Sequence, residues 1–475
     1  MGRKVEVAII GAGSAGLAAL RQIVKKTDKF LLIDQGPLGT TCARVGCMPS
    51  KALIEVAGEF HRRKGLAEKG IGGGEHLTCD IPAVLRHVRR LRDHFAGGMV
   101  ELTRKLAGER LLQGRATLLG PNRIALNGEE IDCAKIILAV GSKPTIPKAW
   151  QPFRDRILTT DTLFEQKSLP PRLALVGLGT NGLELGQALA RLGIEVTGFG
   201  RNPFIGGIRD PEINRIALEA LGRDFPLHVG SEAEVEVMPR QDSLLIRSDS
   251  HEAEVDAFIA TTGVVPNLEG LGLENLGVKL DENGLPPFSP HTLQVCDLPV
   301  FIVGDANGYL PVLHEAQDEG FIAGRNAIGE TVQRYRRRTP LRIGFTNPQI
   351  ALVGMTFDKL DPADMVIGRA DFTDQSRALI EGKNSGLLHV YVEKTTARLL
   401  GGEMAIPEAE HLAQILAVAV QEKLTVHEAL MMPFYHPTVE EGLRSALRDA
   451  ALQLVDTHPA EEMALCGSCP AAPLC

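Results

Sequence analysis

The sequence predicts an α/β protein with two Rossmann-like dinucleotide-binding units and a C-terminal part of mixed α+β structure. Two observations predict this fold class. A strand-like apolar run, a GxGxxG turn, a helical stretch and a second strand follow one another near the N-terminus, and the same order returns from Leu173. From Leu341 onward, short strand-like runs alternate with helical ones. A chain of 475 residues is long enough for about three domains.

The first unit begins with an apolar run at 5–10, continues through GAGSAG at 11–16 and a helix at 17–24, and ends with a strand at 30–33. Gly11 and Gly13 permit a tight turn and close approach of a pyrophosphate, and Gly16 lets the helix pack against the sheet. Asp34 follows the third glycine by 18 residues, where a carboxylate can accept a ribose hydroxyl. The alternative is a glycine-rich turn without a ligand.

The second unit has its glycines at Gly177, Gly179 and Gly182, a helix to residue 192 and a strand at 196–199. In the first unit Asp34 lies 18 residues after the third glycine. The same distance after Gly182 leads to Gly200, and the next residue is Arg201. A missing carboxylate beside a guanidinium weakens the case for NAD and permits a 2′-phosphate, as in NADP. Arg201 is alternatively an exposed surface residue.

Between and after the two units the pattern is less regular. We expect helices over 50–106, a β-type stretch ending at 136–140, and a linker marked by prolines at 144, 147 and 152. A strand at 301–303 leads into Gly304 and Asp305, and a helix follows from His314. The basic run at 334–338 is interpreted as a solvated linker. Beyond it we expect strands near 351, 387 and 399 and helices at 412–421 and 443–454.

Composition excludes several classes of protein. The chain has 51 Lys and Arg against 59 Asp and Glu, a net charge of −8, and 4% aromatic residues, which argues against a nucleic-acid binder. Eight cysteines are too few for a secreted disulfide scaffold. No apolar run reaches the roughly 18 residues of a membrane span, and Glu6 interrupts the only signal-like stretch. We therefore expect a cytoplasmic protein that binds neither nucleic acid nor membrane.

Cys42 and Cys47 form the sharpest chemical signal. Residues five apart in a regular helix are separated by about 7.5 Å along the axis, so a disulfide between these two requires a distorted turn, which Gly46 and Pro49 permit. A close pair in a cytosolic protein indicates redox or metal chemistry. A metal site would need a second ligand pair, which the sequence does not offer, so no metal is expected. The isolated cysteines at 79, 133 and 296 are interpreted as buried small hydrophobes.

The segment LGTTCARVGCMPSK at 38–51 resembles the redox-active disulfide motif of the flavoprotein pyridine nucleotide-disulfide oxidoreductases. That family includes dihydrolipoyl dehydrogenase, glutathione reductase and mercuric reductase. The resemblance spans nearly the whole chain, through GAGSAG, AVGS at 139–142, GLGTNGLELG, IVGDANG at 302–308, TNPQIALVG at 346–354 and HPTVEE at 436–441. At position 140 the family usually has Thr, and this chain has Val.

The resemblance implies that FAD is bound by 1–148 together with 265–335, that NAD(P) is bound by 149–264, and that 336–475 forms a dimerisation domain. Cys47 would be the charge-transfer thiolate near the flavin, Cys42 the interchange thiol, and Lys51 with Glu184 an ion pair beside the reactive flavin nitrogen. Asp34 would hold the adenosine ribose and Asp305 the ribityl chain. The implied FAD residues are Gly11, Gly13, Ala15, Gly16, Asp34, Thr41, Lys51, Ala116, Gly141, Gly304, Asp305 and His314, and the implied NAD(P) residues are Gly177, Gly179, Gly182, Arg201 and Gly263.

His436 and Glu441 match the acid/base dyad of the family. An imidazole ordinarily titrates near neutral pH, so it can take a thiol proton and return it. The alternative is structural, because Thr438 to Glu441 is also an S/T-x-x-E capping box that opens the last helix. In the family this histidine reaches the disulfide of the other subunit, which implies a homodimer.

The chain resembles dihydrolipoyl dehydrogenases most, because it has the His436 and Glu441 dyad and Gly206-Gly207 after the second unit. The implied activity is oxidation of a dihydrolipoyl dithiol through Cys42, Cys47 and FAD, with hydride passed to NAD+ and a role in cell redox homeostasis. Gly200 and Arg201 instead favour an NADPH-dependent disulfide or mercuric reductase. From another class, a flavin-bearing electron-transfer or binding subunit without turnover is the alternative.

The last segment, after Asp456, contains Cys466, Cys469 and Cys475 among Pro and Ala. Its composition is typical of a disordered tail with incidental cysteines. A single CxxC is a weak zinc signal, although Cys475 would complete three ligands. The alternative hypothesis is a redox relay that carries a CxxC disulfide to the Cys42 of the partner.

Overall fold

The computed structural model describes residues 3–231, 235–249 and 251–454, which divide into two compact units. Unit 1 combines residues up to Leu169 with Ile259–Arg337, and unit 2 combines Pro170–Phe258 with the chain from Arg338 onward. No helix among the described residues is both long enough and apolar enough to cross a membrane. Structural matches described below place both units in the predicted α/β class.

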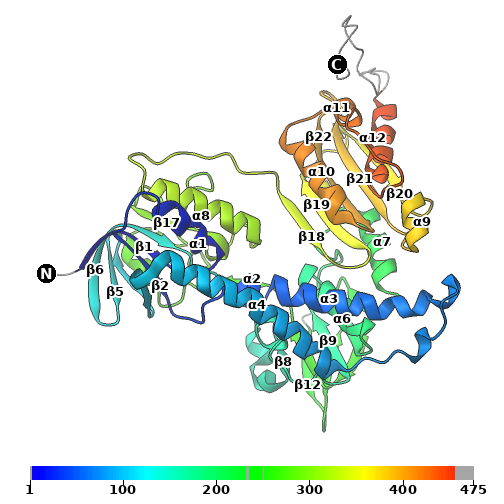
Figure 1. The fold of residues 1–475 in the computed structure, drawn as a ribbon, viewed down its shortest axis with the longest axis horizontal. Coiled ribbons are helices and arrows are strands. Elements are labelled where there is room, and N and C mark those ends of the chain that lie inside the picture. Colours follow the sequence, from blue (N-terminus) through cyan, green and yellow to red (C-terminus); the bar gives the residue numbers. More distant parts are fainter. Residues whose placement is uncertain (1–2, 232–234, 250, 455–475) are drawn as a thin grey trace, which may run out of the picture. The chain divides into compact units, whose positions relative to one another are not determined.

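Unit 1 is built on a sheet with the strand order β3-β2-β1-β6-β5-β4, in which β17 also pairs with β6 (Figure 1). The strands β1 (Arg3–Ile10), β2 (Phe30–Asp34), β3 (Leu111–Gln113) and β17 (Val300–Ile302) run parallel to β6 (Glu129–Leu138). β5 (Arg123–Leu126) and β4 (Thr117–Gly120) add an antiparallel edge. The parallel strands are apolar throughout their buried parts, as expected for a sheet covered on both faces.

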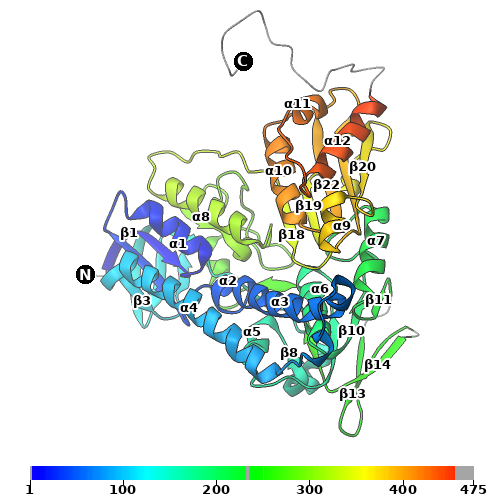
Figure 2. The same ribbon diagram turned by 45° about the vertical axis from the view of Figure 1, so that its right-hand side comes forward.

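Two helices from distant parts of the sequence pack side by side on this sheet, namely α1 (Ser14–Ile23) and α8 (Leu313–Ala327) (Figures 1 and 2). Glycines on α8 permit the close contact. A Cβ on Gly320 would lie 2.1 Å from the carbonyl oxygen of Ala15, and one on Gly324 would lie 2.7 Å from that of Ala19. α1 also carries the GxGxxG turn, so this packing fixes the position of the turn.

The helical region of unit 1 consists of a short helix α2 (Thr41–Arg44), then α3 (Cys47–Arg62) and the long helix α4 (Ile81–Ala107). Asp80 caps α4 through the amide of Ala83. The proline-marked linker is more ordered than the sequence predicted. β7 (Ser142–Pro144) pairs with β16 (Val264–Pro266) in a two-stranded antiparallel ribbon, and the short elements β8 (Ile157–Leu158) and α5 (Thr160–Leu163) follow.

Unit 2 begins with the second βαβ unit, which consists of β9 (Arg172–Val176), α6 (Thr180–Arg191) and β10 (Glu195–Gly200). β10 lies parallel to β9 on one side and to β11 (Leu227–Val229) on the other, and α7 (Pro211–Leu221) connects β10 with β11. An antiparallel group follows, made of β12 (Glu236–Pro239), β13 (Leu244–Ser248) and β14 (His251–Val255). β15 (Ala257–Ala260) contains the point where the chain passes into unit 1.

The C-terminal part of unit 2 is an antiparallel sheet in the order β18-β19-β22-β21-β20. α10 and α12 lie beside this sheet in both views (Figures 1 and 2). Two of its strands, β18 and β20, were missed by the sequence analysis. The elements are β18 (Leu341–Gly344), β19 (Gln349–Gly354), β20 (Met365–Asp371), α9 (Ser376–Glu381), β21 (Leu387–Glu393), β22 (Leu399–Ile406), α10 (Ala409–Gln421), α11 (Val426–Leu430) and α12 (Glu441–Gln453).

Candidate active site

The first glycine turn joins the end of β1 to the start of α1. Gly11 has φ +110°, and a Cβ there would lie 2.1 Å from the carbonyl oxygen of Ala139, so only glycine fits. A Cβ on Gly16 would lie 1.9 Å from the carbonyl oxygen of Gly11. Around the N-cap residue Gly13, by contrast, no atom lies within 4 Å of the Cβ position. The turn is therefore rigid underneath and open at the helix N-terminus, which suits a phosphate group.

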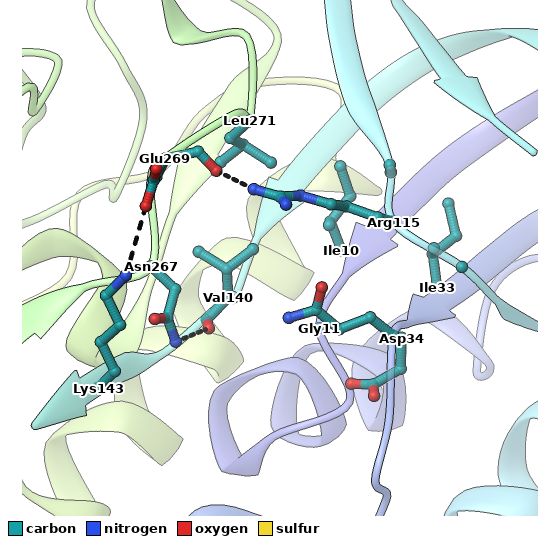
Figure 3. Close-up of a pocket in the computed structure, with 13 residues that line it drawn as sticks. Ile10, Gly11, Ile33, Asp34, Arg115, Val140, Lys143, Asn267, Glu269 and Leu271 are labelled. Atoms are coloured by element: carbon teal, nitrogen blue, oxygen red, sulfur yellow. Dashed lines mark hydrogen bonds and ion pairs between the residues drawn. The ribbon is translucent and has the colours of Figure 1, made fainter. Parts of the chain in front are cut away.

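Asp34 ends β2 and accepts hydrogen bonds from the amides of Ala12 (2.7 Å) and Gly36 (2.6 Å). Its carboxylate has acceptor sites left for a hydroxyl. Asp34 lines a cavity of about 310 Å³, and Ala116 and Gly11 of the glycine turn line the same cavity (Figure 3). A cavity whose lining combines a ribose-binding carboxylate and other polar groups with apolar side chains suits an adenosine moiety, so these residues fit the adenosine end of FAD.

Five polar residues of this cavity were missed by the sequence analysis, namely Gln35, Arg115, Lys143, Asn267 and Glu269. Arg115 donates to the carbonyl oxygen of Glu269, and the Lys143 ammonium lies 3.5 Å from the Glu269 carboxylate (Figure 3). Asn267 donates to the carbonyl oxygen of Val140 at 3.1 Å. The contacts made by Glu269 and Asn267 join residues more than 100 positions apart, and no local motif signals them.

A third segment of unit 1 brings Gly304 and Asp305 to the start of α1, the helix that follows the first glycine turn. A Cβ on Gly304, which has φ +66°, would lie 3.0 Å from the Cβ of Ala15. Asp305 accepts a hydrogen bond from Ser142 at 2.8 Å, next to Gly141. The structure thus collects Ala15, Gly141, Gly304 and Asp305 in one region of unit 1. Thr41 and His314 are exposed, and their assignment to FAD stays a prediction.

A buried ion-pair group supports this segment and corrects one expectation. Glu319 of α8 accepts from the Gly304 amide (2.6 Å) and from Asn307 (2.7 Å), and Arg337 donates to its other oxygen at 2.9 Å. Burial raises the pKa of Glu319, although the charge of Arg337 opposes that shift. Arg337 also pairs with Glu315. The interpretation of 334–338 as a solvated linker is therefore wrong for Arg337, whose side chain is 13% exposed.

The two cysteines of the motif meet at a break between helices. α2 ends at Arg44, Gly46 has φ −107° and ψ −114°, and α3 begins at Cys47. A Cβ on Gly46 would lie 3.2 Å from the Cα of Cys42, so the break is tight. Both cysteines are reduced thiols and half-buried. The pKa of Cys42 is raised, first by its hydrogen bond to Cys47, then by burial and by the charge of Cys47.

The break has a helix cap that the sequence analysis did not identify. Thr40 has φ +60° and accepts the amide of Ala43 at 3.3 Å, so it is the N-cap of α2. Thr41, which the family resemblance selects, is exposed. The pair of adjacent threonines was the available signal, because threonine is a preferred N-cap residue.

Lys51 and Glu184 belong to different units, so their ion pair stays a prediction. Lys51 lies in the second turn of α3, near the thiols, and its charge acts to lower the pKa of Cys42. Glu184 lies on α6 and is 2% exposed, and it accepts the amide of Phe345 at 2.8 Å. A carboxylate this buried is unusual for a residue that serves only the helix terminus.

The second glycine turn repeats the geometry of the first. Gly177 has φ +108°, and Gly179 is the N-cap of α6 with no atom within 4 Å of its Cβ position. At Gly200 a Cβ would lie 3.1 Å from the side chain of Leu178, which leaves little room for the expected carboxylate. Arg201 is exposed. Gly263 lies in unit 1 with φ +113°, and its role toward NAD(P) stays a prediction.

His436 and Glu441 lie at the start of α12. The Nδ1 atom of His436 lies 3.0 Å from one carboxylate oxygen of Glu441 and 3.2 Å from the other, and the imidazole is 72% exposed. Glu441 also accepts the amide of Thr438 at 3.3 Å. The Thr438 hydroxyl instead donates to the carbonyl oxygen of Tyr435, so only half of the expected capping box forms.

The interpretation of the isolated cysteines is partly wrong. Cys133 is buried, and burial raises its pKa to about 12. Cys79 is only half-buried, and Cys296 is exposed. Cys466, Cys469 and Cys475 lie outside the described residues.

Within the described residues, one group has ligand atoms close enough for a metal ion, namely Glu408, Glu410 and His411. Glu408 is already paired with Lys383 at 2.6 Å, and Gln349 contacts Glu410 at 3.3 Å. These contacts give the cluster the features of an ordinary surface ion-pair group.

Comparison with known proteins places these features in one family. Residues 5–320 match the family model described as pyridine nucleotide-disulphide oxidoreductase, and residues 341–447 match the dimerisation domain of that family. Dihydrolipoyl dehydrogenase from Thermus scotoductus is 31% identical over 93% of this chain and 96% of its own length. Mercuric reductase from Staphylococcus aureus is 28% identical over 93% of this chain and 81% of its own length.

Solved structures give the same result. LpdA from Mycobacterium tuberculosis is 25% identical, with a TM-score of 0.81 over 94% of this chain and 99% of that chain. RclA from Escherichia coli, a flavoprotein disulfide reductase, shares the fold with a TM-score of 0.80 at 20% identity, over 94% of this chain and 99% of that chain. This chain therefore belongs to the pyridine nucleotide-disulphide oxidoreductase family, as an oxidoreductase that acts on a sulfur group with FAD and NAD(P) as cofactors.

Proposed function

We propose that the protein is a dihydrolipoyl dehydrogenase, which converts a dihydrolipoyl dithiol and NAD+ into the cyclic disulfide, NADH and a proton. The observation that carries this proposal is the contact between Cys42 and Cys47 at the helix break. A thiol pair held in contact can form a disulfide and reopen it without rearranging either helix. Dihydrolipoyl dehydrogenase relatives that match over nearly the whole chain support the choice of substrate.

The chain would hold FAD through the open turn at Gly13, the Asp34 cavity and Asp305. When bound, FAD supplies a two-electron carrier between thiols and a nicotinamide. We propose the domain division given by the sequence, with FAD on 1–148 and 265–335, NAD(P) on 149–264 and dimerisation through 336–475.

The remaining chemistry belongs to the protein side chains. One substrate thiolate attacks the sulfur of Cys42, which breaks the Cys42–Cys47 bond and leaves Cys47 as a thiolate. His436 accepts the proton of the second substrate thiol, which then displaces Cys42 and closes the substrate disulfide. His436 returns its proton to the departing Cys42 sulfur, so Cys42 ends as a thiol beside the Cys47 thiolate. The raised pKa of Cys42 supports this assignment because it keeps the proton on Cys42.

We propose that the active form is a homodimer in which His436 serves the cysteine pair of the partner. In a single chain the imidazole is 72% exposed, and Glu441 holds Nδ1, which leaves Nε2 to exchange a proton. Exposed apolar residues on the same part of the chain support a covering partner, among them Ile380 (66%) and Tyr435 (81%). The low cysteine content supports a cytoplasmic location.

An NADPH-dependent disulfide or mercuric reductase is the second candidate. It is favoured by Gly200 and the exposed Arg201 and by the similarity to mercuric reductase. Steady-state assays decide between the two. We expect dihydrolipoamide with NAD+ to give a kcat/KM at least about tenfold above that for glutathione disulfide or mercuric ion with NADPH. A faster rate with either of those acceptors would replace the proposal with the second candidate.

A further inference from the structure

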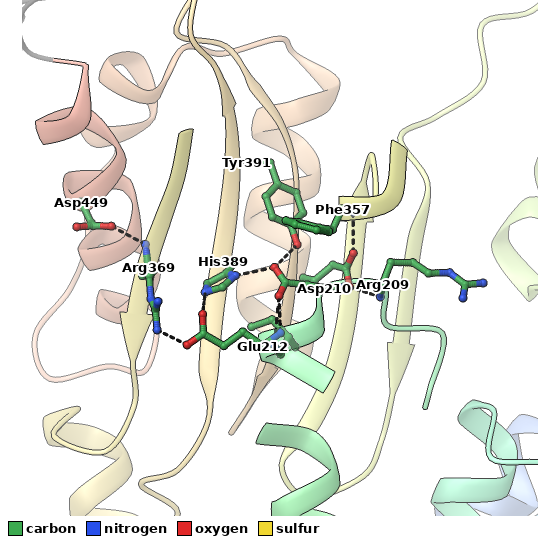
Figure 4. A network of polar contacts seen from close by, with 10 residues as sticks. Arg209, Asp210, Glu212, Phe357, Arg369, His389, Tyr391 and Asp449 are labelled. Carbon is green, nitrogen blue, oxygen red and sulfur yellow. Dashed lines mark hydrogen bonds and ion pairs between the residues drawn. The ribbon is translucent and has the colours of Figure 1, made fainter. Parts of the chain in front are cut away.

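A cluster of buried ionisable side chains lies in unit 2 and shares no residue with the cysteine pair or with the His436 dyad. We call it the α7 anchor and define it as Asp210, Glu212, His389, Tyr391 and Glu403 (Figure 4). Asp210 and His389 are each 2% exposed, and Glu403 and Tyr391 are fully buried. Buried charges are costly unless they are paired, so a group of this size calls for a role.

His389 lies on β21 between two carboxylates of α7. Its Nδ1 atom lies 2.7 Å from a carboxylate oxygen of Asp210, and its buried Nε2 atom lies 3.6 Å from one of Glu212. An imidazolium donates from both nitrogens, whereas a neutral imidazole turns a lone pair toward one carboxylate. The charged form of His389 therefore holds α7 against β21 more firmly than the neutral form.

Asp210 and Glu403 hold the start of α7 from both sides. Asp210 is the N-cap and accepts the amides of Glu212 and Ile213. Burial acts to raise its pKa, but the hydrogen bond and charge of His389, together with the backbone hydrogen bonds from Ile213 and Glu212, outweigh burial and lower the pKa. Glu403 of β22 accepts the amides of Arg209 (2.7 Å) and Asp210 (3.0 Å), and burial raises its pKa.

The segment held in this way is the 201–209 loop, which follows β10 and carries Arg201. The amide of Gly206 donates to the carbonyl oxygen of Leu178 at 3.0 Å, and the Thr180 hydroxyl donates to that of Gly206 at 3.3 Å. Leu178 and Thr180 belong to the second glycine turn. A short series of hydrogen bonds and backbone steps thus connects the α7 anchor to the turn that faces the nicotinamide nucleotide.

We propose that His389 and Glu403 are positioning residues that hold the 201–209 loop for nucleotide binding, so that the affinity for NAD+ depends on the proton of His389. The inference rests on the proposed use of the 177–182 turn by the nucleotide. Neutral His389 presents a lone pair to a carboxylate, loosens the start of α7 and displaces the loop. Affinity falls as the pH rises through the titration of His389, and by linkage nucleotide binding takes up a proton.

The other ionisable groups around His389 are held by contacts of their own. Arg369 of β20 donates to Glu212, and its amide donates to Asp449 of α12. The Tyr391 hydroxyl donates to Asp210, and burial raises its pKa further from neutrality. Among these side chains, only an imidazole ordinarily changes charge between pH 5 and 8. Asp358 adds a charge near Tyr391 and pairs with Arg209 at 3.7 Å.

The test is isothermal titration of the FAD-loaded enzyme with NAD+, and in parallel with NADP+, between pH 5.5 and 9. Titrations in two buffers of different ionisation enthalpy count the protons taken up on binding. We expect the dissociation constant to rise about fivefold or more across this range, with net uptake of a fraction of a proton. In His389→Gln the dissociation constant stays flat at the weak value and proton uptake disappears.

His389→Lys tests the charge without the titration, because an ammonium keeps its charge throughout this range. It should show a flat and tighter dissociation constant than His389→Gln. Glu219→Gln is the matched control, because Glu219 is exposed on α7 and forms a surface ion pair with Arg215 of the same helix. It should match the wild type. FAD content and circular dichroism check that each variant is folded.

Two results would overturn the inference. One is a wild-type enzyme whose NAD+ affinity and proton uptake do not change with pH, and the other is a His389→Gln variant that retains the wild-type profile. The binding assay needs no dithiol, so it separates the two proposals. If the enzyme does not oxidise dihydrolipoamide but takes up the His389 proton when NAD+ binds, the proposed function is contradicted and this inference is supported.

Discussion

We predict that the two cysteines differ in which sulfur atom carries the proton, and the difference can be measured. Cys42 forms a hydrogen bond with Cys47 and has a raised pKa, so we predict that Cys47 carries the negative charge when the pair is reduced. Cys42→Ser should lose at least about a thousandfold in activity. It should keep the long-wavelength absorbance band, which needs only a thiolate beside oxidised flavin. A band found in Cys47→Ser and missing in Cys42→Ser would reverse the two roles.

The prediction for nucleotide choice concerns Arg201. Arg201 is exposed, and no second cation follows within 202–207, whereas a phosphate usually takes more than one charged or bidentate contact. We therefore expect a higher kcat/KM for NADH than for NADPH, and little change in that ratio for Arg201→Ala. A preference for NADPH that disappears in Arg201→Ala would show that this one guanidinium suffices.

Asp210 gives a prediction for the pH dependence of stability. Its pKa is lowered in the folded state, so its stabilising effect is present above the ordinary pKa of an aspartate and is lost as the pH falls through the folded-state pKa. Asp210→Asn keeps an N-cap and removes the charge beside His389. We expect the variant to melt about 3–8 °C below the wild type at pH 7, and the gap to close in acid. If the difference in melting temperature between variant and wild type does not change with pH, the variant has lost packing and not a charge interaction.

Sequence analysis identifies residues whose role depends on neighbours that are close in the sequence. Gly11 and Gly177 were identified from their turns, and both have the positive φ that such turns require. Arg337 was misread, because a basic run looks solvated until Glu315 and Glu319, which lie about 20 positions earlier on α8, are brought against it. Residues whose partners are distant in sequence leave no periodic or spacing signal.

At the scale of elements, the break between α2 and α3 is the feature on which the thiol contact depends. A Cβ on Gly46 would lie 3.2 Å from both the Cα of Cys42 and the carbonyl oxygen of Thr41, and both are backbone atoms that cannot easily yield. Gly46→Ala should separate the thiols, lowering kcat about tenfold or more while FAD stays bound. The measurement is turnover together with the rate at which the reduced enzyme closes its disulfide.

A glycine on the same helix supplies the control. Gly58 lies inside α3 with no atom within 4 Å of its Cβ position. Gly58→Ala should keep full activity and stabilise the protein by about 0.5–1 kcal/mol, because alanine is the better helix former. Equal activity of the two variants would show that the break tolerates a side chain and that the thiol contact does not depend on it.

The elements that escaped prediction are short edge strands. β20 alternates buried and exposed residues, and β18 is four residues long and mostly half-buried. Both are edge strands of the order β18-β19-β22-β21-β20. An edge strand pairs on one side only, so its sequence shows a weaker hydrophobic pattern than that of a central strand. The central strands β21 and β22, which are buried over most of their length, were visible as apolar runs.

At the scale of the whole molecule, the two βαβ units were predictable because each carries its own strand, turn and helix in sequence. The α7 anchor was not predictable, since Asp210 and His389 are 179 positions apart and belong to no motif. The sequence offered the proline-rich stretch and the basic run as boundaries; the compact units divide within the basic run at Arg337, but their other divisions are at Leu169 and Phe258 and not at the prolines. Packing of distant segments decides such boundaries, and composition reports it only indirectly.

The proposed dimer makes a prediction that no single chain can satisfy. If His436 serves the cysteine pair of the partner, then Cys42→Ser and His436→Gln homodimers are both inactive, the second by about 10²–10⁴. A mixed dimer contains one intact site, made of the cysteines of one subunit and the histidine of the other. Co-expression with two tags should yield such hybrids, and a random mixture should recover about a quarter of the wild-type rate.

The same experiment excludes the alternative by symmetry. If His436 acted on the cysteines of its own chain, each subunit of the hybrid would carry one defect in its only site, and mixing would restore nothing. Ile380→Asp places a charge on the exposed apolar residues and should weaken dimerisation while FAD content stays unchanged. Monomers of that variant should lack turnover even though both cysteines and His436 are present, because no partner supplies the second half of the site.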